Sequence, residues 1–137
     1  METLRYKWPV SATVLLVEDE VIVRLGIAEF LRESGFVVHE ASMAAEAIEV
    51  LTKGPSIDLL ITDVRMPGAM DGFALARWVK SFASDVKVIL TSGVVSQGGE
   101  GEVVQLVKPY TQEQMLRAIQ VMMADHPHLS DEREGAT

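Results

Sequence analysis

The stretch TVLLVEDE, residues 13–20, joins a short run of aliphatic residues directly to three consecutive carboxylates. The apolar part lacks the strict polar–apolar alternation of a half-exposed strand, which favours a strand buried on both faces. Four further runs of the same kind occur at residues 36–39, 59–62, 86–90 and 103–107. Strands buried on both faces are typical of parallel sheets, because helices cover both sides of such sheets.

The segments between these runs carry apolar residues at helical spacings of three and four. A stripe that begins at Val23 predicts a first helix ending near Gly35. Ser42 is expected to cap a second helix, which Gly54 and Pro55 should end.

Two more helices are predicted further along the chain. Asp71 is expected to cap the third, whose apolar face we expect to reach Phe82. Thr111 and Gln114 have the spacing of a capping box at the start of the last helix. Strands alternating with helices predict an α/β fold, a three-layer α/β/α sandwich with right-handed crossovers.

The connection between the fourth and fifth runs is unusual. Residues 91–102 contain four glycines, and glycine is a poor helix former. A parallel crossover needs roughly a dozen residues, so this segment has about the minimum length. We expect a loop or a single turn there, with a fourth helix that is reduced or absent.

Composition narrows the class of protein. The 137 residues are 48% hydrophobic, carry a net charge of −8 and include no cysteine. Such a chain can bury a core, which excludes wholesale disorder, and it cannot form disulfides or thiolate metal sites. The acidic balance argues against nucleic acid and anionic membrane as partners. We expect a cytoplasmic protein, and the sequence leaves a monomer and a homodimer both open.

The boundaries follow from where the periodic pattern begins and ends. Residues 12–124 are expected to form one domain, preceded by an N-terminal extension at 1–11 and followed by a flexible acidic tail at 125–137.

Polar side chains stand where the predicted strands end. Glu18 and Asp19 follow the first run and Asp63 the third, while Thr91 and Lys108 end the fourth and fifth. In an open parallel sheet the carboxyl ends of the strands share one edge, where ligands bind. We therefore expect all five side chains at that edge.

Three carboxylates held together repel one another unless a cation intervenes. Hard oxygen ligands that leave room for water and phosphate favour Mg²⁺. Asp63 could then attack a phosphoryl group as a nucleophile. Lys108 and the Thr91 hydroxyl would stabilise the charge on the phosphoryl oxygens.

Four motifs in this order resemble the receiver domains of bacterial two-component response regulators. Both single-domain, chemotaxis-regulator-like receivers and receivers appended to hybrid sensor kinases fit this resemblance. The motifs are LLVEDE (15–20), ITDVRMP (61–67) with MDG (70–72), ILTSG (89–93) and VKPY (107–110). The resemblance covers residues 12–124. It implies a flavodoxin-like, five-stranded parallel sheet of order 2-1-3-4-5.

The resemblance also implies a role for each matching residue. Asp63 would be the phosphoacceptor, and Thr91 would be the switch hydroxyl. Glu18, Asp19 and Asp63, with the backbone carbonyl of Arg65, would bind Mg²⁺. Lys108 would pair with the phosphate, and its bond to Pro109 would be a cis peptide. The phosphoryl donor would be a phosphohistidine of a sensor histidine kinase or a phosphotransfer protein, and the signal would pass to a downstream protein that the sequence does not name.

Gln105 departs from the family pattern, because it replaces the switch aromatic that usually stands three residues before the lysine. In the family, movement of the switch hydroxyl is coupled to rotation of that aromatic side chain. With Gln105 at this position, the sequence does not predict such a coupling for Thr91.

The phosphoryl-accepting switch that the resemblance implies would not be a turnover enzyme. Two alternative functions stay open beside it. One is a pseudo-receiver that serves only as a docking module. The other is an aspartyl-phosphate phosphatase, which needs a second carboxylate two residues after the nucleophile, where this chain has Arg65.

Overall fold

The computed structural model describes residues 12–93 and 104–124. The predicted extension, the acidic tail and most of the glycine-rich crossover, including the expected loss of a helix there, lie outside these residues. The described elements are β1 (Thr13–Val17), α1 (Val21–Glu33), β2 (Val37–Ala41), α2 (Ala44–Lys53), β3 (Leu59–Asp63), α3 (Gly72–Phe82), β4 (Lys87–Ser92), β5 (Val104–Val107) and α4 (Gln112–Ala124).

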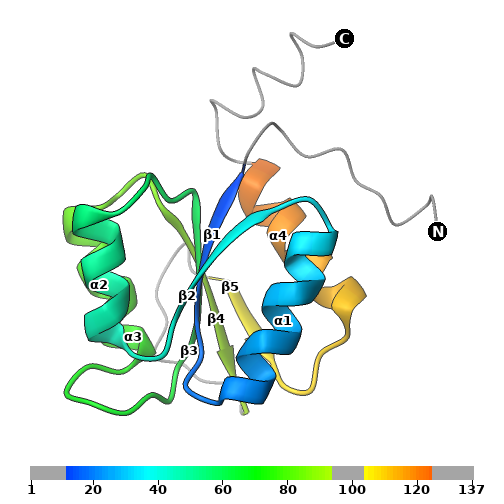
Figure 1. Cartoon of the computed structure of the whole chain (residues 1–137), viewed down its shortest axis with the longest axis horizontal. Coiled ribbons are helices and arrows are strands. Elements are labelled where there is room, and N and C mark those ends of the chain that lie inside the picture. Colours follow the sequence, from blue (N-terminus) through cyan, green and yellow to red (C-terminus); the bar gives the residue numbers. More distant parts are fainter. Residues whose placement is uncertain (1–11, 94–103, 125–137) are drawn as a thin grey trace, which may run out of the picture.

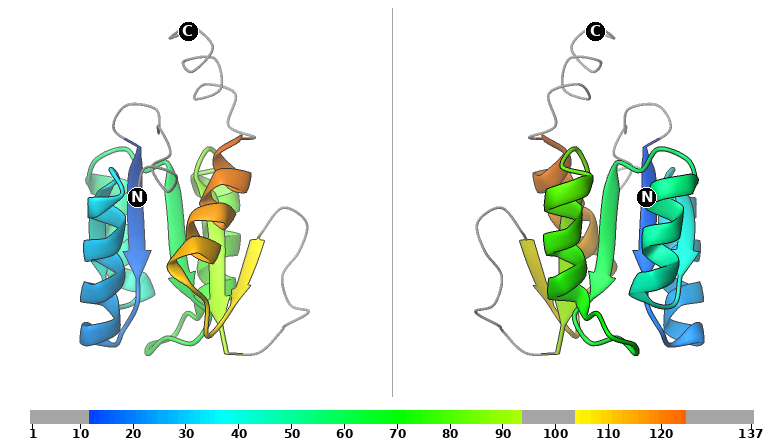
Figure 2. Two further views of the ribbon diagram at one scale, coloured as in Figure 1. Left: turned by 90° about the vertical axis from the view of Figure 1, so that its right-hand side faces the viewer. Right: turned by 90° about the vertical axis from the view of Figure 1, so that its left-hand side faces the viewer.

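The five strands form one parallel sheet in the order β2-β1-β3-β4-β5. This confirms the predicted three-layer α/β/α fold and its strand order. Figure 1 shows the sheet edge-on, with α2 and α3 on one side and α1 and α4 on the other. The side views in Figure 2 show helices running antiparallel to the strands they cover.

Each face of the sheet has its own hydrophobic core, because successive strand residues point to opposite faces. Leu16 and Ile61 pack with α1 and α4 on one face. Leu15 and Leu60 pack with α2 and α3 on the other. All four leucine and isoleucine side chains are fully buried, which is why their strands read as continuous apolar runs.

The predicted caps are confirmed at two helices. The Asp71 carboxylate accepts a hydrogen bond from the Ala74 amide at 2.8 Å. At α4, the Gln114 amide donates to the Thr111 hydroxyl at 3.0 Å, and the Thr111 amide donates to the Gln114 side chain at 2.8 Å. These local bonds are determined by short-range spacing, so the sequence alone could locate them.

Three local expectations are wrong. Met43, not Ser42, is the N-cap of α2, and the Ser42 amide and hydroxyl instead donate to Glu46. Phe82 is 72% exposed, because α3 ends there, past the edge of its core. Val23, in the first turn of α1, is 38% exposed, whereas Ile27 one turn later packs against the core.

In the part of the chain that the structure describes, every helix is too short or too polar to cross a lipid bilayer.

Candidate functional site

The strand order reverses between the neighbouring strands β1 and β3. From β1 the chain continues to β2 on one side, whereas from β3 it continues to β4 on the other side. Open α/β sheets bind ligands outside the carboxyl ends of the strands at such a switch point. Glu18 and Asp19 follow β1 directly, and Asp63 is the last residue of β3. The topology therefore brings the predicted acidic residues to one place.

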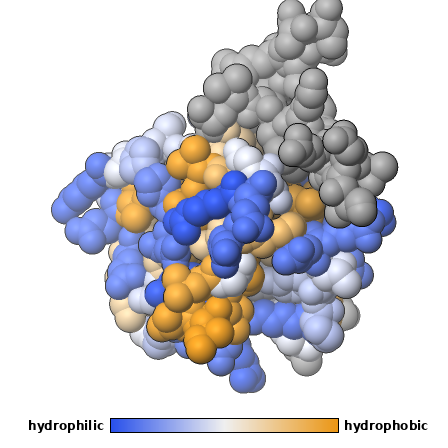
Figure 3. Space-filling model, turned by 45° about the vertical axis from the view of Figure 1, so that its right-hand side comes forward, coloured by the Kyte–Doolittle hydropathy of each residue, from blue (hydrophilic) through white to orange (hydrophobic). Residues whose placement is uncertain are grey.

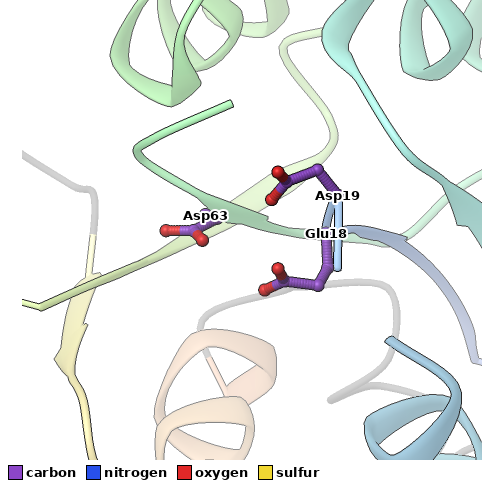
Figure 4. A group of neighbouring side chains, drawn as sticks. All are labelled: Glu18, Asp19 and Asp63. Carbon is purple, nitrogen blue, oxygen red and sulfur yellow. The ribbon is translucent and has the colours of Figure 1, made fainter. Parts of the chain in front are cut away.

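The carboxylates of Glu18, Asp19 and Asp63 form a compact group in which one oxygen of each lies within 4.8 Å of the others. Figure 4 shows the three side chains beside the ends of β1 and β3. Glu18 is only 2% exposed and Asp63 only 8%, whereas Asp19 faces solvent. The carboxylates of Glu18 and Asp63 are thus buried close together, and the Asp19 carboxylate lies on the solvent side of the group.

Glu18 is held by the end of β2 and by its own turn. Its amide donates to the Ala41 carbonyl at 3.0 Å, and its carboxylate accepts from the Glu20 amide at 3.1 Å. Burial raises the pKa of Glu18 above its ordinary value of 4.5. The Glu20 hydrogen bond and Lys108 act in the opposite direction, and Asp63 and Asp19 raise the pKa further.

Lys108 supplies the positive charge. Its ammonium lies 2.9 Å from Asp63 Oδ2 and 3.7 Å from Glu18 Oε1. Burial by itself would lower the pKa of Lys108, but the hydrogen bond and charge of Asp63, with the charge of Glu18, outweigh it and raise that pKa above 10.5. Its backbone amide donates to the Ser92 carbonyl at 2.7 Å, and the Lys108–Pro109 peptide bond is cis.

Thr91 is buried and lies opposite Asp63 in the β3–β4 register. The Val64 amide donates to the Thr91 carbonyl at 2.9 Å, so the ends of both strands are fixed relative to each other. Gln105 lies half-buried on β5, opposite Leu90.

Arg65 lines a cleft of about 560 Å³ together with Asp19 and Asp71. The remaining lining residues are Val64, Met66, Pro67 and Phe73. That the Arg65 carbonyl faces a metal stays a prediction.

Gly72 is a site residue that the sequence reasoning missed. A Cβ on Gly72 would collide with the Asp63 carbonyl oxygen and would lie 2.7 Å from Val64 Cα. Its amide donates to the Val64 carbonyl at 2.8 Å. The start of α3 therefore packs directly against the backbone of Asp63, and only glycine permits that approach. The MDG motif contained this signal, but the sequence could not show what the glycine approaches.

The donor set fits Mg²⁺ better than a softer metal. The group offers carboxylate oxygens only, with one member at the solvent and an adjoining cleft that leaves room for water and phosphate. Burial keeps the pKa of Glu18 above its ordinary value although Lys108 lies close by, so the charged form of this carboxylate would be stabilised by a further positive charge. A divalent cation would supply it.

Comparison with known proteins agrees with this geometry. The response regulator receiver domain model matches residues 14–120. The chain belongs to the response regulator receiver domain family. It is 36% identical over 120 residues to the sensor kinase CckA of Brucella abortus, covering 82% of this chain and 13% of that kinase. It is 35% identical over 121 residues to the transcriptional regulatory protein PdtaR of Mycobacterium tuberculosis, covering 84% of this chain and 58% of that protein. The receiver chain thus spans a small part of one relative and somewhat more than half of the other.

Solved receivers have the same architecture. A response regulator receiver protein from Sinorhizobium medicae superposes with a TM-score of 0.79 at 30% identity, covering 85% of this chain and 97% of that one. The chemotaxis response regulator CheY4 of Vibrio cholerae gives 0.75 at 28% identity, covering 82% and 99%. Receiver domains are signalling modules of two-component systems that bind Mg²⁺ in an acidic pocket and interact with histidine kinases or phosphotransfer proteins.

Proposed function

We propose that this receiver accepts a phosphoryl group on Asp63 in a Mg²⁺-dependent reaction and passes the signal on through phosphorylation-dependent protein contacts. The observation that carries the proposal is the 2.9 Å contact between Asp63 Oδ2 and Lys108 Nζ, within a cluster of side chains that also includes Glu18 and Asp19. A carboxylate held next to a cation and two further acids is suited to attack phosphorus.

In the proposed reaction a carboxylate oxygen of Asp63 attacks the phosphorus of a phosphohistidine. The new O–P bond forms as the P–N bond breaks, and the bonding electron pair stays on the imidazole nitrogen. Lys108 neutralises charge on the transferring oxygens, and the Thr91 hydroxyl donates a hydrogen bond to one of them. Glu18, Asp19 and Asp63, with the Arg65 carbonyl, would hold Mg²⁺, which supplies further charge neutralisation when bound.

The donor must cover the carboxyl edge of the sheet to bring its phosphohistidine to Asp63. Exposed apolar residues begin directly beside that edge, at the start of α1: Val21, Ile22 and Leu25, of which Ile22 is 84% exposed. Figure 3 shows hydrophobic side chains gathered on this part of the surface. Grouped exposed apolar residues are typical of protein-contact surfaces, so we place the docking of the sensor kinase or phosphotransfer protein on this α1 patch.

The test is the intact mass of the protein after incubation with acetyl phosphate, with and without Mg²⁺. The parent should gain one phosphoryl group only with Mg²⁺, and Asp63→Asn should gain none. Asp58→Asn is the matched control, since Asp58 precedes the same strand, at its opposite end. It should be labelled like the parent.

Two outcomes would contradict the proposal. Labelling of Asp63→Asn to the level of the parent would place the acceptor elsewhere. An unlabelled parent under every donor tried would favour a docking module that works without phosphorylation.

A further inference from the structure

A single side chain connects the acidic turn to the neighbouring strand. Arg24, in the first turns of α1, donates from Nη1 to the backbone carbonyl of Glu18 at 2.8 Å. Its Nε donates to Glu40 Oε1 at 3.1 Å. Glu40 lies on β2, opposite Leu16 of β1. The guanidinium therefore bridges β2 and the turn that follows β1.

The carbonyl that Arg24 holds belongs to the peptide between Glu18 and Asp19. Fixing this peptide plane fixes the direction in which the chain leaves β1, and with it the placement of both carboxylates. The other contacts of the turn, from Glu18 to Ala41 and to Glu20, hold the residue before that peptide and its side chain. The hydrogen bond from Arg24 holds the Glu18 carbonyl itself, and it comes from α1, outside the turn.

We infer that Arg24 is a positioning residue for the Glu18–Asp19 pair, with Glu40 as the anchor that orients its guanidinium. The inference rests on the proposed function of the acidic site. Arginine suits the task because its planar fork makes two hydrogen bonds in fixed directions and keeps its charge. A lysine ammonium is a point charge on a flexible stem and cannot reproduce that geometry.

Arg32 provides a matched control within the same network. Its Nη2 pairs with the other oxygen of the same carboxylate, Glu40 Oε2, at 3.1 Å. Its backbone acceptor, however, is the Val38 carbonyl at 2.9 Å, which lies on β2 and not in the acidic turn. Loss of Arg32 removes one ion pair to Glu40 and leaves the contact to Glu18 in place.

The experiment compares Arg24→Gln, Arg24→Lys and Arg32→Gln by two measurements. The first is Mg²⁺ affinity by calorimetry, which should fall about tenfold for both Arg24 variants, as is usual when a residue that orients metal ligands is lost. Arg32→Gln should stay within about twofold of the parent. The second is the NMR signal of the Glu20 amide in metal-free protein, because that amide reports the placement of the Glu18 carboxylate.

The Glu20 signal should move in both Arg24 variants and stay in place in Arg32→Gln. Equal behaviour of Arg24→Gln and Arg32→Gln in both measurements would overturn the inference and leave Arg24 with a purely structural role. If Arg24→Gln does not fold, Glu40→Gln replaces it, since this change weakens the anchor and should reduce Mg²⁺ affinity in the same direction. Because the amide is observed without metal or phosphate, it tests the inference even if the parent takes up no phosphoryl group, a result that would overturn the proposed function alone.

Discussion

Strand β3 has an aspartate at each end, and the two are held in opposite ways. Asp58, just before the strand, accepts a hydrogen bond from the Thr13 amide at 2.8 Å, and its own amide donates to the Thr13 carbonyl at 2.9 Å. Asp63, at the other end, lies among two further carboxylates and one ammonium. The first carboxylate is satisfied by backbone, while the second is surrounded by charge.

The difference shows how one strand can serve both stability and chemistry. A carboxylate that accepts backbone hydrogen bonds is stabilised as an anion and joins the edges of two strands. A carboxylate packed against other acids raises the free energy of the metal-free fold, and a bound cation relieves that cost. The comparison predicts that substitutions at the two ends of the sheet will differ in their effects on stability and on phosphoryl transfer. In one case the effects on the free energy of unfolding should be opposite in sign.

The largest effect is expected for Gly72→Ala, which would place a methyl group against the backbone of Asp63 and Val64. Overpacking of this kind costs about 3 kcal/mol of unfolding free energy when backbone must move, and the displaced Asp63 should lose phosphoryl uptake as well. Gly26→Ala is the control: a Cβ there meets no atom within 4 Å on the exposed side of α1. It should stabilise the protein by about 0.5–1 kcal/mol, because alanine is the better helix former.

Urea unfolding of both variants, with intact-mass labelling, tests this prediction. A Gly72→Ala protein as stable and as readily phosphorylated as the parent would show that the start of α3 can move away from Asp63 without cost.

A smaller effect is expected from surface changes at the two edges. Ile22→Lys, beside the carboxyl edge, should slow phosphoryl transfer from a protein donor about tenfold, equivalent to about 1.4 kcal/mol, through lost apolar contact in the proposed docking surface. Phe82→Lys changes another strongly exposed apolar residue, at the end of α3 and on the opposite edge of the sheet, and should leave transfer unchanged.

Labelling by acetyl phosphate separates docking from chemistry, because the small donor needs no docking surface. Both variants should react with it like the parent. Equal rates for Ile22→Lys and Phe82→Lys with the protein donor would exclude the α1 patch as its docking surface.

The sequence predicted the sheet because its strands are short, apolar and buried on both faces. This pattern can be recognised in the sequence without knowledge of the tertiary fold. It also predicted that Glu18, Asp19, Asp63 and Lys108 would meet, since parallel strands bring their carboxyl ends to one edge. The structure brings these four side chains together.

Other features depend on contacts that no local pattern encodes. The burial of Gly72 against Asp63 and the bridge from Arg24 to Glu40 join residues on different elements. The exposure of Phe82 depends on where the core beneath α3 ends. Helical spacing predicts which residues share a face, but it cannot predict how far the neighbouring layer extends.

The smallest effect is also the one that reverses sign between the two ends of the sheet. Because the pKa of Glu18 is raised in the fold, the native state binds its proton more tightly than the unfolded chain. Unfolding free energy therefore falls as pH rises from the ordinary value of 4.5 through the higher native pKa. Without metal at neutral pH, Glu18→Gln removes this cost and should raise the free energy of unfolding.

Asp58→Asn should act in the opposite direction. The asparagine can still accept the Thr13 hydrogen bond, but it loses the charge, which should cost about 0.5–1 kcal/mol. Urea unfolding in EDTA at a series of pH values, from the ordinary glutamate pKa of 4.5 up to neutral pH, measures both effects. The advantage of Glu18→Gln over the parent should be larger at the higher pH values, and Mg²⁺ should reduce it, because only the parent keeps both Glu18 and Asp19 as carboxylates to bind the ion. A destabilised Glu18→Gln in EDTA at neutral pH would mean that the pairing of Glu18 with Lys108 outweighs the burial of its charge. The two ends of the sheet would then differ in chemistry but not in how they affect stability.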